Sequence, residues 1–304
     1  MARTACLGKI NLSLRITSLL PNGYHELCSL FCKIGPIDYL TINPEKEDNV
    51  RVIYNRAQTP IVGENILNKT LRIAREAFSS IPCVDLTLEK NVPPGTGLGA
   101  GSGDAAALIR YLSETYTVPA EALASRIGAD VPFLASDSQL AIAHGTGAHI
   151  QDIERPFSDI VIVVIIPSWR CQTPEMYKKL DQCYMGKWTL NADEAQKEAF
   201  DIIKKINDGV SIGLLPNDFT SVLFDERTEY RQLFNEFFRQ GAFAWGVSGS
   251  GSSSFALWKK QLFNGFDCKL SWIEDRFTFY VNAQDKRGNG YERSAYRTSN
   301  PHHI

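Results

Sequence analysis

The sequence PPGTGLGAGSGDAAALIRYL, residues 93–112, joins a glycine-rich loop to an apolar segment that has the character of a buried helix. Glycine stands at every second position from Gly95 to Gly103, and apolar residues dominate from Ala105 onward. Glycine permits positive φ angles and lets backbone N–H groups approach a ligand closely. A helix that starts beside such a loop adds unpaired N–H groups and a partial positive charge. The stretch therefore predicts an anion-binding loop, most naturally one for phosphates.

Two familiar phosphate motifs and a flexible linker are the alternatives for this loop. A Walker A loop ends in Gly-Lys-Ser or Gly-Lys-Thr, whereas this loop ends in GSGD (residues 101–104) without a lysine. The dinucleotide fingerprint is matched only loosely, and the prolines at 93 and 94 interrupt the tight strand-to-helix turn that it requires. Because linkers seldom lead straight into an apolar helix, phosphate binding is favoured over a hinge.

A second glycine cluster, GVSGSGSSSFAL at residues 246–257, lies between two apolar segments that we expect to be strands. Such a cluster is typical of a hairpin turn. Beside the first loop, it is also a candidate second wall of a nucleotide or substrate site. The sequence leaves both possibilities open.

Apolar periodicity predicts an α+β protein in which strands are followed by helices without regular alternation. We place a domain boundary near residues 150–158, which gives an N-terminal domain at 1–155, a C-terminal domain at 156–284 and a flexible tail at 285–304. Strands are expected within residues 1–55 and at 84–88, 160–166, 242–247, 254–258 and 277–281, and helices at 65–81, from 105 to 112, at 119–128 and at 229–239.

Composition excludes several classes of partner. The 304 residues include 32 Lys and Arg against 34 Asp and Glu, a net charge of −2, so no general basic field attracts nucleic acid or membranes. The longest apolar run, at 160–166, is far shorter than the ~18 residues of a membrane helix. The first residues lack the pattern of a secretory signal. Seven scattered cysteines without a CxxC pair indicate reduced thiols, so we expect a cytoplasmic protein.

Phosphoryl transfer requires charge neutralisation and an acceptor for the alcohol proton, so we searched for a suitable Asp and Lys. Asp130 follows a predicted helix in GADVPF (128–133); its alternative is a solvated residue at a helix-to-strand turn. Lys9 and Asn11 share one face of a predicted strand, and an exposed edge lysine is the alternative there. Tyr24 and His25 follow a Pro-Asn-Gly turn, where a histidine is more often structural. The sequence has neither an HExxH nor a GxSxG motif.

Four segments together resemble the GHMP kinase superfamily, named for galactose, homoserine, mevalonate and phosphomevalonate kinases. They are GKINL (8–12) with NGYHE (22–26), PPGTGLGAGSGDAAA (93–107), GADVPF (128–133) and GVSGSGSS (246–253), and the resemblance spans about residues 5–282. It implies a two-domain α+β fold with a ribosomal protein S5 domain 2-like first domain and a ferredoxin-like second domain, and with ATP and substrate in the cleft between them.

The residues of the NGYHE and GADVPF segments are most similar to those of one branch of the superfamily. Its members phosphorylate the 2-hydroxyl of a cytidine diphosphate-linked methylerythritol with ATP, in the non-mevalonate route to isoprenoid precursors. The resemblance implies two small-molecule partners, this alcohol and ATP, and a monomer or weak homodimer. Two alternatives remain: another GHMP kinase of the mevalonate or homoserine type, and a non-catalytic protein with this fold that binds a ligand.

The resemblance also implies roles for individual residues. Asp130 is expected to be the base for the substrate hydroxyl, and Lys9 to keep it ionised. Asn11 would contact the substrate near this pair. Tyr24 and Tyr177 would stack on the cytosine and His25 would recognise its edge.

The other implied contacts are with the substrate and the nucleotide. Gly249 and Ser250 are further substrate contacts, and Asn65 falls where the family approaches adenine. Mg²⁺ would accompany ATP without a dedicated protein cage, so no metal ligands are assigned. The residues implied to wrap the phosphates are Pro93, Pro94, Gly95, Thr96, Gly97, Leu98, Gly99, Ala100, Gly101, Ser102 and Gly103.

The phosphate loop departs from the family pattern GLGGGSSDAA or GLGGGSSNAA at two positions. Ala100 replaces a glycine, and Gly103 replaces the second serine. The second change removes a hydroxyl that could contact phosphate or Mg²⁺ and leaves Ser102 alone. We expect activity to survive because backbone N–H groups do most of the binding, and we leave the ATP affinity open.

Overall fold

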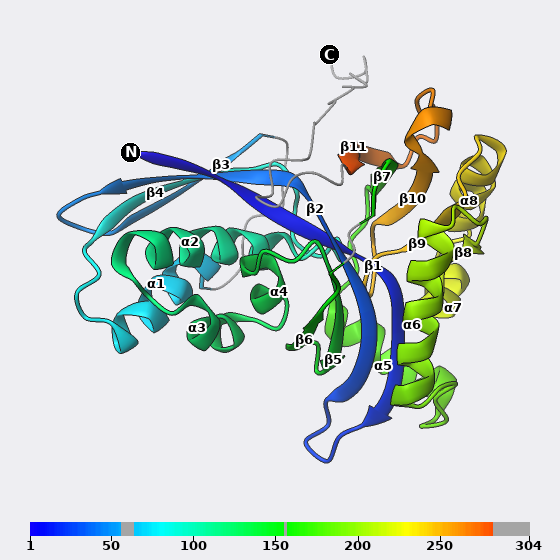
Figure 1. The fold of residues 1–304 in the computed structure, drawn as a ribbon, viewed down its shortest axis with the longest axis horizontal. Helices are drawn as coiled ribbons and strands as arrows, with labels where there is room; N and C mark the ends of the chain where they lie inside the picture. Colours follow the sequence, from blue (N-terminus) through cyan, green and yellow to red (C-terminus); the bar gives the residue numbers. More distant parts are fainter. Residues whose placement is uncertain (56–63, 155–156, 282–304) are drawn as a thin grey trace.

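The computed structural model describes residues 1–55, 64–154 and 157–281 and has two mixed α/β parts, each built on one sheet (Figure 1). The first part contains β1 (Ala2–Leu19), β2 (His25–Pro44), β3 (Asn49–Tyr54), α1 (Ile66–Ala77), β4 (Val84–Lys90), α2 (Ala100–Tyr116), α3 (Ala120–Ile127), α4 (Val131–Ala135), β5 (Leu140–Gly145) and β6 (His149–Asp152). The second contains β7 (Ile160–Pro167), α5 (Thr173–Tyr184), α6 (Ala192–Asn207), β8 (Gly213–Leu214), α7 (Phe219–Glu226), α8 (Glu229–Arg239), β9 (Ala244–Val247), β10 (Ser254–Lys259), a 3-10 turn (Lys260–Leu262) and β11 (Ile273–Val281).

The first sheet has the order β3-β4-β2-β5-β6, with β1 paired to β2, and α1 to α4 lie together on one side of it (Figure 1). Its strands alternate as the sequence predicts: Val84, Leu86 and Leu88 of β4 are buried against the helices, and their neighbours are not. This packing places the start of α2 directly beside β1.

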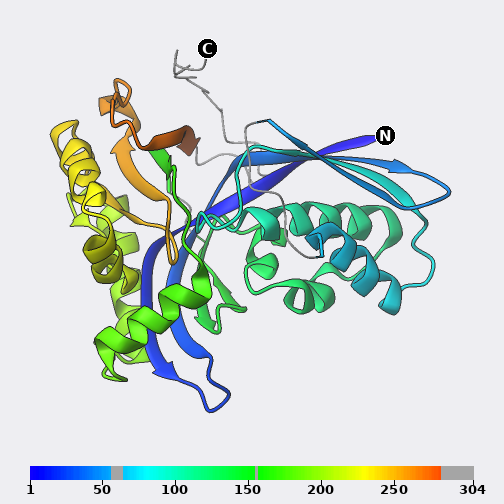
Figure 2. The ribbon, with the colours of Figure 1, turned by 180° about the vertical axis from the view of Figure 1, so that it is seen from behind.

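The hairpin of β1 and β2 is longer than the rest of its sheet and continues into the second part, where it lies beside α6 (Figure 2). Leu14 and Ile16 belong to the same buried cluster as the second sheet. Between them, Arg15 donates to Glu198 of α6 at 2.8 Å and to Asp218 at 2.8 Å. The hairpin therefore connects the two parts through apolar packing and through ion pairs.

The second sheet has the order β11-β7-β10-β9-β8 and is covered on both faces. All eight residues of β7 are buried, as the continuous apolar run predicts for a two-sided strand. One face packs on α5, α7 and α8, and the other on α6 and the hairpin. The α+β prediction is confirmed. The predicted boundary at 155–156 and the tail at 285–304 lie outside the described residues.

Two predicted element bounds are wrong for local reasons. The helix expected at 65–81 ends at Ala77, and Phe78 leaves the helix with φ −138°. Two serines and Pro82 follow, and the residue before a proline avoids the helical region. The next helix begins at Ala100, earlier than expected, because Gly99 takes a left-handed conformation with φ 65° and ends the loop there. Gly101 and Gly103 therefore belong to the first turn of α2.

The turn around Asp130 also differs from expectation. Asp130 precedes the short helix α4, so GADVPF joins two helices, α3 and α4, instead of a helix and a strand. Other predicted elements are confirmed, including α3, α8 and the β9–β10 hairpin. None of the helices within the described ranges has both the length and the apolar character that a membrane crossing requires.

Candidate active site

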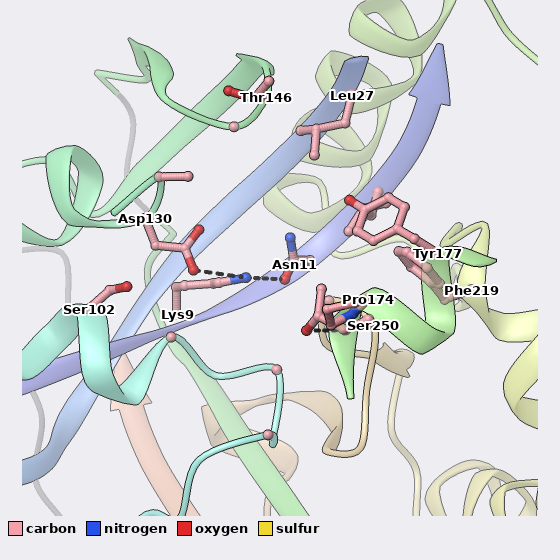
Figure 3. A pocket seen from close by; sticks show the side chains of 18 of the residues that line it. Lys9, Asn11, Leu27, Ser102, Asp130, Thr146, Pro174, Tyr177, Phe219 and Ser250 are labelled. Carbon is pink, nitrogen blue, oxygen red and sulfur yellow. Dashed lines mark hydrogen bonds and ion pairs between the residues drawn. The ribbon is translucent and has the colours of Figure 1, made fainter. Parts of the chain in front are cut away.

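A cleft of about 880 Å³ lies where the two parts meet, a size typical of small-molecule sites (Figure 3). The first glycine loop, β1, the start of α4, the second glycine loop and α5 all contribute to its wall. Most of the predicted site residues line it: Lys9, Asn11, Tyr24, His25, Pro93, Pro94, Gly95, Thr96, Gly97, Gly99, Ala100, Gly101, Ser102, Asp130, Tyr177, Gly249 and Ser250. Asn65, Leu98 and Gly103 are outside this lining.

The two glycine loops touch each other at one end of the cleft. Gly97 has φ +77°, and a Cβ there would lie 2.1 Å from the carbonyl oxygen of Ser248. The Ser248 hydroxyl donates to the Gly97 carbonyl at 2.8 Å, and the Ser253 N–H donates to the Thr96 carbonyl at 3.0 Å. The second cluster is thus a hairpin turn between β9 and β10 and also the second wall of the cleft.

The first glycine loop is also fixed to β1. The Lys9 N–H donates to the Leu98 carbonyl at 2.9 Å, and the Leu98 side chain is buried in the core. Gly99 then turns the chain into α2. The first N–H groups of α2 have no partner within the helix and face a cleft rimmed by Gly99, Ala100 and Ser102. The loop is therefore a rigid backbone cradle with the partial positive charge that anions prefer.

The positions of Gly103 and Asn65 change what their side chains can do. A Cβ at Gly103 would lie 1.8 Å from the Leu7 carbonyl oxygen, so the missing side chain would point into β1 and away from the cleft. The Asn65 side chain accepts the Leu67 N–H at 2.9 Å and caps α1, while the neighbouring Ile66 lines the cleft. The hydroxyl expected to be lost at 103 would therefore not face a phosphate in this packing.

Lys9 and Asp130 face each other in the middle of the cleft (Figure 3). The Lys9 Nζ lies 3.7 Å from Asp130 Oδ2 and donates to Asn11 Oδ1 at 2.7 Å. The Asn11 amide in turn donates to the Ser29 hydroxyl at 2.8 Å. Lys9 is only 6% exposed, whereas the Asp130 side chain is 26% exposed and open to a ligand. A carboxylate that is open to a ligand in this way can accept a proton from an alcohol.

The far end of the cleft is aromatic. The His25 ring stacks on Tyr177 with centroids 4.6 Å apart, and His25 Nε2 lies 2.6 Å from Asp181 Oδ1. Burial, and secondarily the charges of Asp130 and Asp181, raise the pKa of Tyr177 to about 12, so it stays a neutral phenol. Tyr24 is 66% exposed at the rim. The ring that the structure places on Tyr177 is thus His25, whereas the resemblance implies a cytosine there.

Comparison with known proteins agrees with this geometry. The model of the GHMP kinase N-terminal domain matches residues 65–153, from α1 to β6. A 4-diphosphocytidyl-2-C-methyl-D-erythritol kinase of Chloroherpeton thalassium is 34% identical over 256 residues, which cover 82% of this chain and 86% of the relative. The chain belongs to the GHMP kinase family. Its curated relatives carry the name of that erythritol kinase.

Solved structures support the same family. A crystal structure of a 4-(cytidine 5'-diphospho)-2C-methyl-D-erythritol kinase superposes with a TM-score of 0.69 at 28% identity, covering 84% of this chain and 90% of that one. The homoserine kinase of Cytophaga hutchinsonii superposes with a TM-score of 0.53 at 15% identity, covering 97% of this chain and 99% of that one. The second likeness shows the fold alone.

Sequence reasoning missed several residues that line the cleft of this GHMP kinase. Lys178 and Asp181 follow Tyr177 on α5, Phe219 starts α7, and Thr146 lies in the turn between β5 and β6. The α5 residues could have been found from helical spacing around Tyr177. Phe219 and Thr146 carry no comparable signal, because only the packing of distant elements brings them to the site.

A buried charge cluster beside the start of α2 was also missed. Lys90, at the end of β4, donates to Asp38 of β2 at 2.6 Å and to Asp104 of α2 at 2.6 Å. All three side chains are almost fully buried. Burial raises the pKa of Asp104 to about 7 even though Lys90 opposes the shift. The cluster ties the start of α2 to the sheet and so holds the cradle of this GHMP kinase in place.

Proposed function

We propose that this protein is an ATP-dependent kinase that phosphorylates the 2-hydroxyl of 4-diphosphocytidyl-2-C-methyl-D-erythritol, in the non-mevalonate route to isoprenoid precursors. The observation that carries the proposal is the position of the Lys9–Asp130 pair, between a backbone cradle for phosphates and an aromatic end for a base. The names of the relatives support this choice of substrate.

In the proposed reaction, Asp130 accepts the proton of the substrate hydroxyl while the oxygen of that hydroxyl forms a bond to the γ-phosphorus of ATP. The bond between that phosphorus and the bridging oxygen to the β-phosphate breaks, and ADP leaves. Lys9, whose Nζ lies 3.7 Å from Asp130 Oδ2, offsets negative charge as it develops. Asn11 holds the Lys9 ammonium in place through the bond between their side chains.

The cradle proposed for ATP depends on glycines that let its loop pack closely on the second glycine loop. A Cβ at Gly97 would collide with the Ser248 carbonyl oxygen at 2.1 Å. For Mg²⁺, the described residues contain no group of three His, Cys, Asp or Glu side chains that could hold a metal. An ion carried by the nucleotide needs only one or two protein oxygens. The Ser102 hydroxyl, which lines the cleft, fits that need, and Mg²⁺ bound with the nucleotide would supply charge neutralisation on the transferred phosphate.

The aromatic end supplies the proposed selectivity for a base. Tyr24 offers exposed ring surface at the rim, and Tyr177, with His25 stacked on it, lies at the same end of the cleft. Base stacking on an aromatic side chain contributes ~1–3 kcal/mol per base. A substrate without a base, such as mevalonate or homoserine, would leave this end unused.

An ADP-release assay with a panel of alcohols tests the proposal. The cytidyl substrate, mevalonate and homoserine are each supplied with ATP and Mg²⁺, and turnover is measured at equal concentration. We expect turnover with the cytidyl substrate and background rates with the other two. Turnover with mevalonate or homoserine but not with the cytidyl substrate would show that the proposed substrate is wrong. ATP binding without turnover of any alcohol would indicate a ligand-binding protein.

A further inference from the structure

Helix α5 presents one stripe of side chains to the cleft. Pro174, Tyr177, Lys178 and Asp181 all line it, and their spacing of three, one and three residues places them on one face of the helix. In Figure 3, Pro174 lies beside Ser250, near Asn11 and the ring of Tyr177. The stripe therefore spans the distance between the reacting end of the cleft and its aromatic end.

Lys178 is the open positive charge on this stripe. Of the described residues that line the cleft, only Lys9 and Lys178 carry a side-chain ammonium or guanidinium group. Lys9 is buried and already engaged by Asn11 and Asp130. Lys178 is exposed, and within the described part of the chain no carboxylate lies within 4.0 Å of its Nζ.

The acidic neighbour on the stripe contacts a different side chain. Asp181 lies one helical turn beyond Lys178, but its carboxylate is engaged by His25 Nε2 at 2.6 Å. The adjacent Lys179 points elsewhere, because its Nζ is paired with Glu226 of α7 and it does not line the cleft. Two consecutive lysines therefore have different tasks: Lys179 joins two helices, and Lys178 faces the cleft.

We propose that Lys178 binds the diphosphate group of a cytidine diphosphate-linked substrate. This inference rests on the proposed function. A ligand whose base lies at Tyr177 and whose hydroxyl reaches Asp130 must pass its two phosphates along the intervening wall, beside Pro174 and Ser250. Its negative charge requires a cation there, and charge-assisted contacts to phosphate are stronger than neutral hydrogen bonds.

The test compares binding of CDP and of cytidine to wild type, Lys178→Gln and Lys179→Gln. Titrations are made with a saturating non-hydrolysable ATP analogue, so that CDP cannot report on the phosphate cradle. We expect Lys178→Gln to weaken CDP binding about tenfold, with cytidine binding unchanged within twofold. We expect Lys179→Gln to change neither affinity. Both lysines are on the helix surface, so thermal melting should show folded proteins throughout.

Each contrary outcome has its own meaning. If Lys178→Gln weakens cytidine as much as CDP, or leaves CDP unchanged, the diphosphate contact is refuted while the proposed function stands. The diphosphate contact would also be refuted if wild type bound cytidine as tightly as CDP or more tightly. If wild type binds neither ligand, the proposed substrate class fails, and this inference fails with it.

Discussion

Replacing Gly103 with alanine tests how closely α2 packs on β1. A Cβ at this position would lie 1.8 Å from the Leu7 carbonyl oxygen, whereas such contacts essentially never fall below 3.0 Å. Both groups belong to backbone elements, so the start of α2 would have to move away from β1 by more than an ångström. Overpacking of this kind costs about 1–3 kcal/mol, sometimes more. The gain in helix propensity from glycine to alanine, about 1 kcal/mol, offsets only part of that cost.

Gly101 supplies the matched control for this prediction. It lies in the same first turn of α2, its φ is not positive, and the nearest atom to an added Cβ is Ile66 Cδ1 at 4.0 Å. In urea denaturation, Gly101→Ala should be as stable as wild type or more so by about 0.5–1 kcal/mol. Gly103→Ala should be less stable than Gly101→Ala by at least ~1–2 kcal/mol. Equal midpoints for the two variants would refute the close packing of Gly103 on Leu7.

Two further predictions concern buried lysines. Burial lowers the pKa of Lys33 to about 7, so the native state binds its proton less tightly than the unfolded chain and wild type loses stability as pH falls from about 10 to 7. As pH falls through that window, the unfolding free energy of Lys33→Met should therefore rise relative to that of wild type by up to about 1.4 kcal/mol per pH unit. A stability difference between the two proteins that does not vary with pH in urea melts would contradict this. Lys90→Met leaves the carboxylates of Asp38 and Asp104 buried without their cation, which should cost about 3–5 kcal/mol of unfolding free energy. Thermal and urea melts that match wild type would show that the cluster is not needed.

Local patterns predicted the parts of the fold that depend on local physics. The alternation in β4, the continuous run of β7 and the stripe of α8 each report burial directly, because side-chain periodicity follows backbone geometry. The end of α1 was missed by four residues, since its apolar stripe continues past the point where the backbone turns at Phe78. Periodicity marks burial and not the end of a helix.

The candidate site was predictable only in part, for a related reason. Lys9, Asp130 and the glycine loops stand out in sequence because their residue types are unusual for their surroundings. The contact of Gly103 with Leu7, the bond of His25 to Asp181 and the Lys90 cluster join residues far apart in the chain. No short-range pattern encodes such contacts, so they emerge only when the strands and helices are packed together.

The kinetics of Asp130→Ala on the cytidyl substrate test the central claim most directly. The Asp130 side chain is a quarter exposed and makes its closest charged contact with Lys9, so the variant should fold and still bind an ATP analogue. We predict that its kcat falls by ~10²–10⁴-fold, with the affinity for the ATP analogue within a few-fold of wild type. A kcat close to that of wild type would contradict the assignment of Asp130 as the base and, with it, the proposed chemistry of the cleft.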